Sequence, residues 1–563
     1  MSIPVPEQKE SVSSTMKVLS IRNLHILFFC TVLALYFPVL GMGFCLDDSF
    51  IVVDNQYTTD WKNLWMLLST DLWEMDPSST EQTSFYRPLF SCSLLLDRSI
   101  ADLNPMWYHA HSLIWFLLCV GGLLQLLKCF VTPSIALLAT AVFAFHPIQV
   151  ETIAWVSARN DSMATAFALG ALLAFCHSKP KPWLGALLCA FALLSKENTL
   201  LLPLWVFFLT SATGKERYRF SAIAGIGIAV AFLCRAGADV PVQWPDKHHW
   251  DLFFSHGMDF FSDTLSLLFL PWPLAPTRAL AWLDVSFLQY LSTIVFLCVM
   301  FGLSMWSLRR YPENNRMLFG GLILFWGAWL PSIIATVING FYGDRYLFLA
   351  SVGFSIWLSG ILSSVGLLAK RIVFFSLIPL LGISYSKLPD WNDEQSIWTS
   401  MNRDIPSPFS QASLAHILHN QGRYAEAASL YEQSFSSEKP WLFGCESYVY
   451  DILQIYGPKA AFTKAEWVIE RGCSRTGSLG SLMAHSLAVQ QDWTRLRRLL
   501  PTLPIDPHRR TEIPWAALLI VDGQWRRVEQ IRMSWPKESN MDQQLLELIR
   551  PIGIHELPAL PTE

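Results

Sequence analysis

Charged residues are scarce in this 563-residue chain: Asp, Glu, Lys and Arg make up 15% of it, whereas 52% of the residues are hydrophobic. With a mean hydropathy of +0.34, the chain is too apolar for an average soluble protein, and it is too long for one domain. A net charge of −4 gives no reason to expect nucleic acid as a partner. The composition predicts a polytopic membrane protein, in contact with the lipid bilayer, with an appended soluble part.

The chain also lacks any C-x-x-C pair, and most of its eleven cysteines fall inside apolar runs. We interpret these as small hydrophobic residues, so the sequence predicts no metal or redox site held by cysteine. The polar N-terminus is not followed by a small-residue cleavage site. We therefore expect residues 1–22 to be cytoplasmic and the first apolar run to be an uncleaved span.

Eleven apolar runs, several of them short, are long enough to cross a hydrocarbon core of about 30 Å. They lie near residues 23–43, 106–127, 131–147, 161–177, 182–197, 198–212, 220–237, 286–307, 317–338, 346–368 and 372–387. These runs predict an all-α transmembrane bundle of about 11 helices over residues 23–389.

Basic clusters predict the orientation of this bundle. They occur without compensating acids at Lys179/Lys181, Arg309/Arg310 and Lys370/Arg371, and the positive-inside rule places such loops in the cytoplasm. Alternation then puts the opposite loops on the outer face: those with Asp47-Asp48, residues 146–161, Lys196-Glu197, residues 238–284 and residues 343–345. An odd number of spans puts the C-terminal part there too.

The first outer loop, residues 44–105, carries two amphipathic segments. Trp61, Leu64, Trp65 and Leu68 recur at helical spacing, as in a helix lying in the membrane interface. A second segment starts after Arg87, with Pro88 at its first helical position. The pair could frame a chamber at the membrane surface or form an interfacial belt without function.

After Asp390 the hydropathy falls and paired-helix spacing begins. Residues 412–435 have the small-residue, glycine-turn and aromatic spacing of a tetratricopeptide repeat, and Asp522-Gly523 suggests the turn of another. We expect residues 390–563 to be a TPR-like α-solenoid on the outer face. Such surfaces bind extended peptides, although dimerisation or rigidity are alternative uses.

Ionisable residues cluster on the predicted outer face, where they are costly unless functional. The carboxylates could activate a hydroxyl and the cations could bind phosphate, beside apolar walls suited to a lipid. A lipid-phosphate donor fits this set, and so does an anion transporter. The set comprises Asp47, Asp48, Arg87, His109, His111, His146, Glu151, Arg159, Asp161, Lys196, Glu197, Asp344 and Arg345.

Each member also has a structural alternative. Asp48 could cap the following helix, and His146 could be a satisfied core imidazole. Arg345 could be an interfacial anchor. Two neighbouring pairs could be local ion pairs without a catalytic role, namely Lys196 with Glu197 and Arg159 with Asp161.

Five motifs, at residues 44–55, 85–89, 146–161, 194–197 and 344–354, resemble in the same order those of the TMTC family. That family comprises transmembrane, TPR-containing protein O-mannosyltransferases of the GT-C class, which use polyprenyl-phosphate sugars. The resemblance covers roughly residues 25–435. The chain departs from the family pattern at Ser112, Gln149 and Ala350, which leaves the sugar and the acceptor open.

The resemblance implies a role for each matched residue. Asp47 or Asp48 would be the catalytic base, and Asp47 is favoured because Asp48 is better placed to cap a helix. Arg345 would bind the donor phosphate, with Lys196 or Arg87 assisting. Residues expected to bind sugar or acceptor are Glu151, His146, Glu197, Asp344 and His109.

The sequence thus predicts an inverting membrane glycosyltransferase acting on Ser or Thr of a protein held by the repeats. The donor would be a polyprenyl-phosphate-linked mannose or similar hexose. Transfer to a glycolipid or wall polymer and a non-catalytic scaffold or transporter are the alternatives. No cofactor is expected, although Asp47 and Asp48 could ligate a divalent cation. The compact repeat region suggests a bacterial inner-membrane protein with a periplasmic outer face, or a lumenal one in an ER membrane.

Overall fold

The computed structural model describes residues 21–74, 84–238, 240, 244–283, 285–474, 478–503, 512–535 and 540–558. The expectation for the N-terminal tail falls almost wholly outside these residues, as does Asp284. The chain forms two compact units, Met1–Glu394 and Gln395–Glu563, each of which is described by itself.

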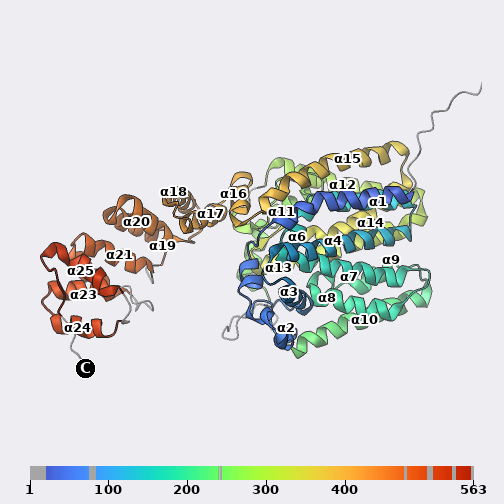
Figure 1. Cartoon of the computed structure of the whole chain (residues 1–563). Helices are drawn as coiled ribbons and strands as arrows, with labels where there is room; N and C mark the ends of the chain where they lie inside the picture. The colour runs from blue at the N-terminus through green and yellow to red at the C-terminus, as the bar shows by residue number, and fades with distance from the viewer. Residues whose placement is uncertain are drawn as a thin grey trace, which may run out of the picture. The chain divides into compact units, whose positions relative to one another are not determined.

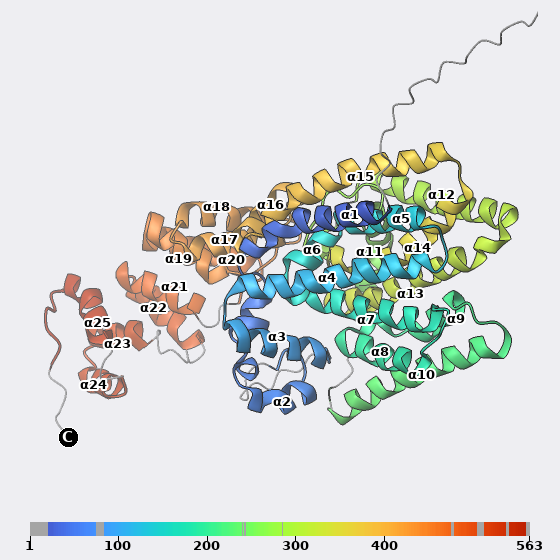
Figure 2. The ribbon, with the colours of Figure 1, turned by 45° about the vertical axis from the view of Figure 1, so that its right-hand side comes forward.

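All eleven apolar runs are helical in the first unit, and the long helices run side by side (Figures 1 and 2). Adjacent packing joins α13 to α14, α7 to α8, α8 to α10 and α4 to α7. The helices are α1 (Ile21–Tyr36), α4 (Pro105–Lys128), α5 (Pro133–Phe145), α7 (Arg159–Cys176), α8 (Pro182–Ser195), α9 (Leu202–Leu209), α10 (Gly214–Gly237), α12 (Phe287–Arg310), α13 (Asn315–Asn339), α14 (Phe348–Ser364) and α15 (Leu367–Lys387).

Seven helices of the described chain, rather than eleven, are long and apolar enough to cross a membrane. Helices α5, α8 and α9 are shorter, with 13, 14 and 8 residues. Helix α7 has 18 residues but begins with Arg159 and Asp161. The expectation of several membrane spans is supported, whereas the count of about eleven stays a prediction: polar residues occupy one end of each of these four helices or the turn next to it.

Glycines let α14 pack closely against α13. A Cβ at Gly321 would lie 2.5 Å from the Trp357 backbone nitrogen, and one at Gly353 would lie 2.3 Å from that of Phe325. Small residues at a helix crossing allow such close approach in membrane bundles. The contact fixes the helix whose N-terminal turn carries Asp344 and Arg345.

The first outer loop contains two short amphipathic helices. Helix α2 (Leu64–Ser69) follows a 3₁₀ turn and buries Leu67, whereas Trp61 and Trp65 are 51% and 74% exposed. Helix α3 (Pro88–Ala101) begins with proline at its first position, as the sequence predicts. The exposed indoles suit an interfacial position.

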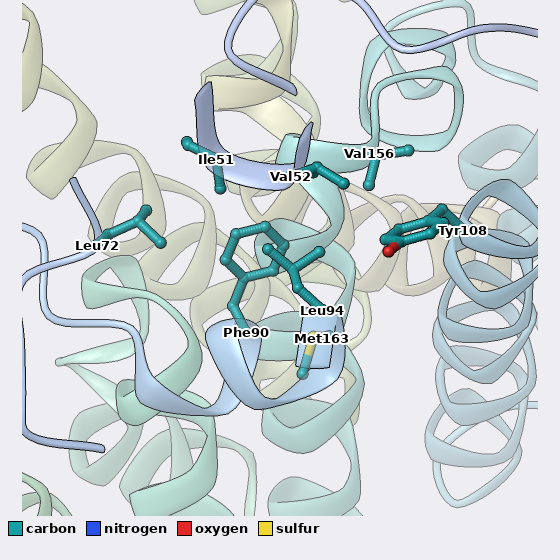
Figure 3. Packing of buried hydrophobic residues seen from close by; sticks show 8 residues of the cluster. All are labelled: Ile51, Val52, Leu72, Phe90, Leu94, Tyr108, Val156 and Met163. Atoms are coloured by element: carbon teal, nitrogen blue, oxygen red, sulfur yellow. The ribbon is translucent and has the colours of Figure 1, made fainter. Parts of the chain in front are cut away.

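A hydrophobic cluster anchors the segment after Asp48 to the bundle (Figure 3). Ile51 and Val52 lie in a single π-helical turn, Ser49–Val53. They pack with Phe90 and Leu94 of α3, and with residues of the loop before α7 and of α4 and α7. Burial of these side chains holds the polypeptide that carries the paired carboxylates.

The loops that precede α12 and α14 meet through a minimal antiparallel pairing. Strand β1 (Arg278–Ala279) follows helix α11 (Lys247–Ser266) and pairs with β2 (Phe341–Tyr342), which precedes the N-terminal turn of α14. The short helix α6 (Gln149–Ala154) lies between α5 and α7. These connections bring loops distant in sequence to one end of the bundle.

The second unit is built from short helices that pack in sequence. Glycines with positive φ stand between the helices of three hairpins, α17–α18, α19–α20 and α23–α24: Gly422, Gly457 and Gly523. The helices are α16 (Glu394–Asp404), α17 (Pro408–Asn420), α18 (Tyr424–Phe435), α19 (Cys445–Tyr456), α20 (Pro458–Glu470), α21 (Ser478–Val489), α22 (Trp493–Leu499), α23 (Glu512–Val521), α24 (Trp525–Met533) and α25 (Met541–Ile549).

A disulfide joins Cys445 at the start of α19 to Cys473 just after α20. The sequence interpretation of the cysteines as core residues did not foresee this bond. The two positions are 28 residues apart and lie outside the apolar runs, which was the available clue.

Candidate active site

Asp48 is a structural carboxylate. It is fully buried, and its Oδ1 accepts hydrogen bonds from the backbone nitrogen of Ser157 at 2.8 Å and from its hydroxyl at 2.5 Å. Its Oδ2 accepts from the backbone nitrogen of Cys45 at 3.3 Å. The expectation that Asp48 caps the following helix is wrong, because its side chain makes no capping bond and is used by the loop before α7 instead.

Asp47 has a different environment. It is half-buried, and its carboxylate accepts no hydrogen bond from the residues that the structure describes. Burial raises the pKa of Asp47, and the positive charge of Arg345 opposes that rise. Burial raises the pKa of Asp48 to about 7 against its bonds from Ser157 and Cys45. Of the two carboxylates, Asp47 is the one available to a substrate.

Arg345 is held from several sides. Its Nη1 donates to Glu151 Oε1 at 2.5 Å, and its backbone nitrogen donates to Glu151 Oε2 at 2.9 Å. The guanidinium carbon lies 4.5 Å from the centre of the Trp155 ring and 5.3 Å from that of Tyr346. Burial raises the pKa of Glu151, and Arg345 opposes this by stabilising the carboxylate. The Arg345 side chain is 20% exposed, so part of it is open to a ligand.

Lys196 lies at the C-terminal end of α8 and pairs with Asp161 of α7, its Nζ standing 2.5 Å from Oδ2. The same Nζ is 5.9 Å from the Tyr346 ring centre. The positive charges of Arg87 and Arg345 both act on Lys196. The three cations therefore share one region of the protein.

Arg87 precedes α3 and binds Glu197 through two nitrogens, with Nη2 at 2.9 Å and Nε at 3.2 Å from the carboxylate oxygens. Lys196 and Glu197 thus do not pair with each other, which corrects the local ion pair considered from sequence. They pair instead with residues of two other elements.

Arg159 does not pair with Asp161 either. It is fully buried, and its Nη1 lies 2.5 Å from Asp97 Oδ2 in α3. Hydrogen bonds to Ser112 Oγ and to the Tyr108 carbonyl complete its shell. The local-pair expectation is wrong, and this network is structural: it ties α3 to α4 and α7.

Three other predicted site residues have structural partners. The His146 ring bonds to the carbonyl of Leu268 at 3.4 Å and is buried. His109 Nε2 lies 3.3 Å from the Gly43 carbonyl, beneath the loop that leads to Asp47. Asp344 accepts from the backbone nitrogen of Ala275 at 2.9 Å and also pairs with Arg278.

The sequence interpretation did not identify Asp97, Ser157 or Arg278. Asp97 and Arg278 lie outside the five motifs, and Ser157 lies within the motif at residues 146–161 but was not singled out there. Each has a partner at least 62 residues away along the chain, namely Arg159, Asp344 and Asp48 respectively. One sign was present for Arg278: an isolated cation in an apolar loop, where a buried charge needs a partner.

The paired carboxylates do not fit a metal site. Asp48 uses both oxygens for hydrogen bonds, which leaves Asp47 alone as a free carboxylate. Within the described residues no group of three or more His, Cys, Asp or Glu side chains could hold a metal ion. The residues present therefore do not form the hard-oxygen cage that a divalent cation prefers.

These residues define the chemistry of the site. Three cations and an unbonded carboxylate lie at one end of a bundle of apolar helices, and the cations are fixed by partners that orient them. Such an arrangement can bind a phosphate and accept a proton from a hydroxyl. The fold and site thus indicate an integral multi-pass membrane protein that gathers three cations and a carboxylate at one end of its helices.

Several protein O-mannosyl-transferases are similar to part of the chain. It is 30% identical to human TMTC3 over 148 residues, which is 26% of this chain and 16% of that protein. It is 27% identical to F38B6.6 of Caenorhabditis elegans over 218 residues, 38% of this chain and 31% of that protein. Drosophila melanogaster Tmtc1 is 28% identical over 296 residues, 47% of this chain and 34% of that protein. The matches thus span about a third or less of these relatives.

No known protein-family profile matches the chain. Among solved structures, ArnT from Cupriavidus metallidurans bound to undecaprenyl phosphate aligns with 82% of this chain and 85% of its own. The TM-score is 0.38 and the identity is 11%. A similarity of this size supports neither a fold nor an activity for this protein. The sequence relatives and the geometry of the site are the support for a function.

Proposed function

We propose that this protein is a GT-C-type glycosyltransferase that transfers a sugar from a polyprenyl-phosphate donor to a hydroxyl. The main observation behind this proposal concerns Asp47: its carboxylate accepts no hydrogen bond from the described residues and interacts electrostatically with Arg345. Distant sequence similarity to protein O-mannosyl-transferases supports mannose or a similar hexose as the sugar.

In the proposed reaction the donor phosphate binds Arg345, with Lys196 and Arg87 nearby. Asp47 removes the proton of the acceptor hydroxyl as the oxygen attacks the anomeric carbon. The new C–O bond forms as the bond to the lipid phosphate breaks on the opposite side, so the configuration inverts. The phosphate leaves with the bonding electron pair, which the cations stabilise.

The helix directions support an outer-face location for this centre. Helix α8 follows Lys181 and ends beside Lys196, while α7 begins with Arg159 and ends shortly before Lys179. The site and the basic clusters thus occupy opposite ends of these helices. Because basic loops face the cytoplasm, we place the site in the periplasm of a bacterial inner membrane, or in the lumen of an ER membrane.

The second unit supports a protein acceptor. Helical hairpins that pack in sequence, with glycine turns between their helices, are the construction of TPR-like repeats, and such surfaces hold extended peptides. The Cys445–Cys473 disulfide fits an oxidising compartment. Both features favour Ser or Thr of a protein on the outer face as the acceptor.

The Asp47→Asn variant tests this proposal. In membranes given a polyprenyl-phosphate sugar, transfer should fall by about 10²- to 10⁴-fold, the usual contribution of a general base, while donor binding persists. The matched control Asp54→Asn alters an exposed carboxylate seven residues away and should keep activity. Transfer at the wild-type rate by Asp47→Asn would refute the assignment, and no transfer by the wild type to any tested acceptor would refute the function.

A second candidate function, favoured by the apolar surroundings of the site, is transfer to a glycolipid or wall polymer. Mass spectrometry of outer-face glycoproteins and of the lipid fraction, with and without the gene, separates the two. Loss of a hexose from proteins supports the first, and loss from lipid alone supports the second.

A further inference from the structure

The last segment of the first unit lies against the candidate site. This junction segment, residues 388–394, begins with the 3₁₀ turn Leu388–Trp391 and leads directly into the second unit. The carbonyl of Asn392 accepts a hydrogen bond from the Gly43 nitrogen at 3.0 Å. The junction segment therefore holds the loop that carries Asp47, four residues further on.

The junction segment also contacts Trp155, the aromatic residue whose ring packs against Arg345. The rings of Trp391 and Trp155 stack with centres 6.3 Å apart and planes inclined by 29°. Both indoles are buried, at 6% and 4% exposure. The Arg345 guanidinium lies over the Trp155 ring at 4.5 Å, so three side chains from distant parts of the chain form one packed series.

The indole of Trp155 has no hydrogen bond, within the described residues, to fix its orientation. Its indole nitrogen is buried and has no hydrogen-bond partner among the described residues. Packing alone therefore sets the ring plane, and Trp391 is the aromatic partner that stacks on it. Stacked pairs of this kind have preferred geometries that resist tilting.

We propose that Trp391 is a positioning residue for donor binding, which orients Arg345 through Trp155. The junction segment is then a wall of the site as well as a connection between units. This inference rests on the proposed function for its kinetic consequence. Its structural consequence, a fixed Arg345, can be measured independently of activity.

The kinetic test compares Trp391→Ala with Trp391→Phe. Loss of the stack should raise the KM for the polyprenyl-phosphate sugar roughly tenfold, in line with the strength of an aromatic pair, and change kcat little, because Asp47 is untouched. Phenylalanine keeps a stacking ring and should restore a KM within about twofold of the wild type. Trp306→Ala, which removes a half-exposed indole from the last turns of α12, is the matched control.

The structural test follows hydrogen exchange at the Arg345 amide in the full-length protein in detergent. That amide donates to Glu151, so its protection reports whether Arg345 is in place. Exchange should be at least several-fold faster in Trp391→Ala and unchanged in Trp391→Phe and Trp306→Ala.

These measurements separate the two proposals. If the wild type transfers no sugar while exchange at Arg345 rises in Trp391→Ala, the proposed function fails and the positioning role stands. Wild-type exchange at Arg345 in Trp391→Ala, or an equal loss in the alanine and phenylalanine variants, overturns the positioning role. General unfolding of Trp391→Ala would speed hydrogen exchange in all peptides together and lower the Tm, and this outcome would also count against the positioning role.

Discussion

Asp47 and Asp48 are neighbours in sequence but differ in their surroundings. The carboxylate of Asp48 is enclosed by donors from Ser157 and Cys45, whereas that of Asp47 accepts no hydrogen bond from the described residues and is influenced by the charge of Arg345. Although they are consecutive residues, the two side chains have different neighbours. Environment, rather than residue type, therefore distinguishes the hydrogen-bonded carboxylate of Asp48 from that of Asp47, the base of the proposed reaction.

Asp48→Asn should change how stability depends on pH. The folded-state pKa of Asp48, about 7, exceeds its ordinary value of 3.8, so the folded protein binds this proton more tightly than the unfolded chain. Its stabilising effect is complete below about pH 4 and is lost as pH rises through 7. The Tm of the wild type relative to Asp48→Asn should thus be higher at pH 5 than at pH 8. A difference that stays constant with pH would contradict the assignment, and Asp54→Asn is the control.

Arg345→Lys should weaken donor binding while preserving charge. Lysine cannot lie flat over Trp155 and also reach Glu151 as the guanidinium does. We expect a rise of about 10- to 100-fold in the donor KM, the equivalent of one charge-assisted hydrogen bond. Steady-state kinetics measure it. Arg371→Lys, an exposed position at the start of α15, should leave the KM unchanged.

The sequence identified most of the charged residues that gather at the site, but not which of them form ion pairs with one another. Lys196 and Glu197 are adjacent and point to different elements, and Arg159 and Asp161 lie two apart on a helix, where side chains do not face each other. Their true partners, such as Asp97 and Arg87, are distant in sequence. Pairing of this kind follows from the packing of helices, which periodicity does not reveal.

At the level of elements, the turn before α14 depends on Gly343. A Cβ there would lie 2.6 Å from both Glu151 Oε1 and the Pro276 carbonyl, and 2.8 Å from Arg345 Nη1. The glycine thus permits Glu151 and Arg345 to meet beside the loop that follows α11. The turn before α14 would have to move if residue 343 carried any side chain.

Gly343→Ala should therefore lower both Tm and donor affinity. The carbonyl of Pro276 is backbone and cannot rotate away, so the turn itself must move and carry Arg345 with it. Thermal unfolding and donor titration measure the two effects. Gly302→Ala, where an added Cβ meets no atom within 4 Å, is the control; equal behaviour of the two variants would contradict the steric argument.

The helices themselves were predictable because long apolar runs have few other stable forms in a membrane. The lengths of the helices were not. His146 and Lys196 follow directly on α5 and α8, and apolar composition alone does not show where such a helix stops. The paired helices after residue 390 were visible through their glycine turns, whereas the disulfide was not.

For the whole molecule, the disulfide provides a test of orientation. A loop of 28 residues closed by Cys445 and Cys473 should stabilise the second unit by about 3 kcal/mol. We expect Cys445→Ser to lower its unfolding temperature, with Cys473→Ser equivalent and the exposed Cys298→Ser without effect. In spheroplasts, a membrane-impermeant maleimide should label Cys473 in Cys445→Ser and Cys445 in Cys473→Ser, but neither position in the oxidised wild type, as read from the labelled peptides by mass spectrometry. Labelling only after lysis would place the unit in the cytoplasm.

The one-to-one pairing of cations and carboxylates has a consequence for turnover. Arg87, Lys196 and Arg345 are each neutralised by one acid before any ligand arrives. In the proposed reaction the donor phosphodiester would carry a single negative charge, whereas the released lipid phosphate would carry about −1.5 to −2, so cations without partners would bind the product more strongly than the substrate. The three acids would weaken binding of the product, and the released lipid phosphate would then diffuse back into the bilayer.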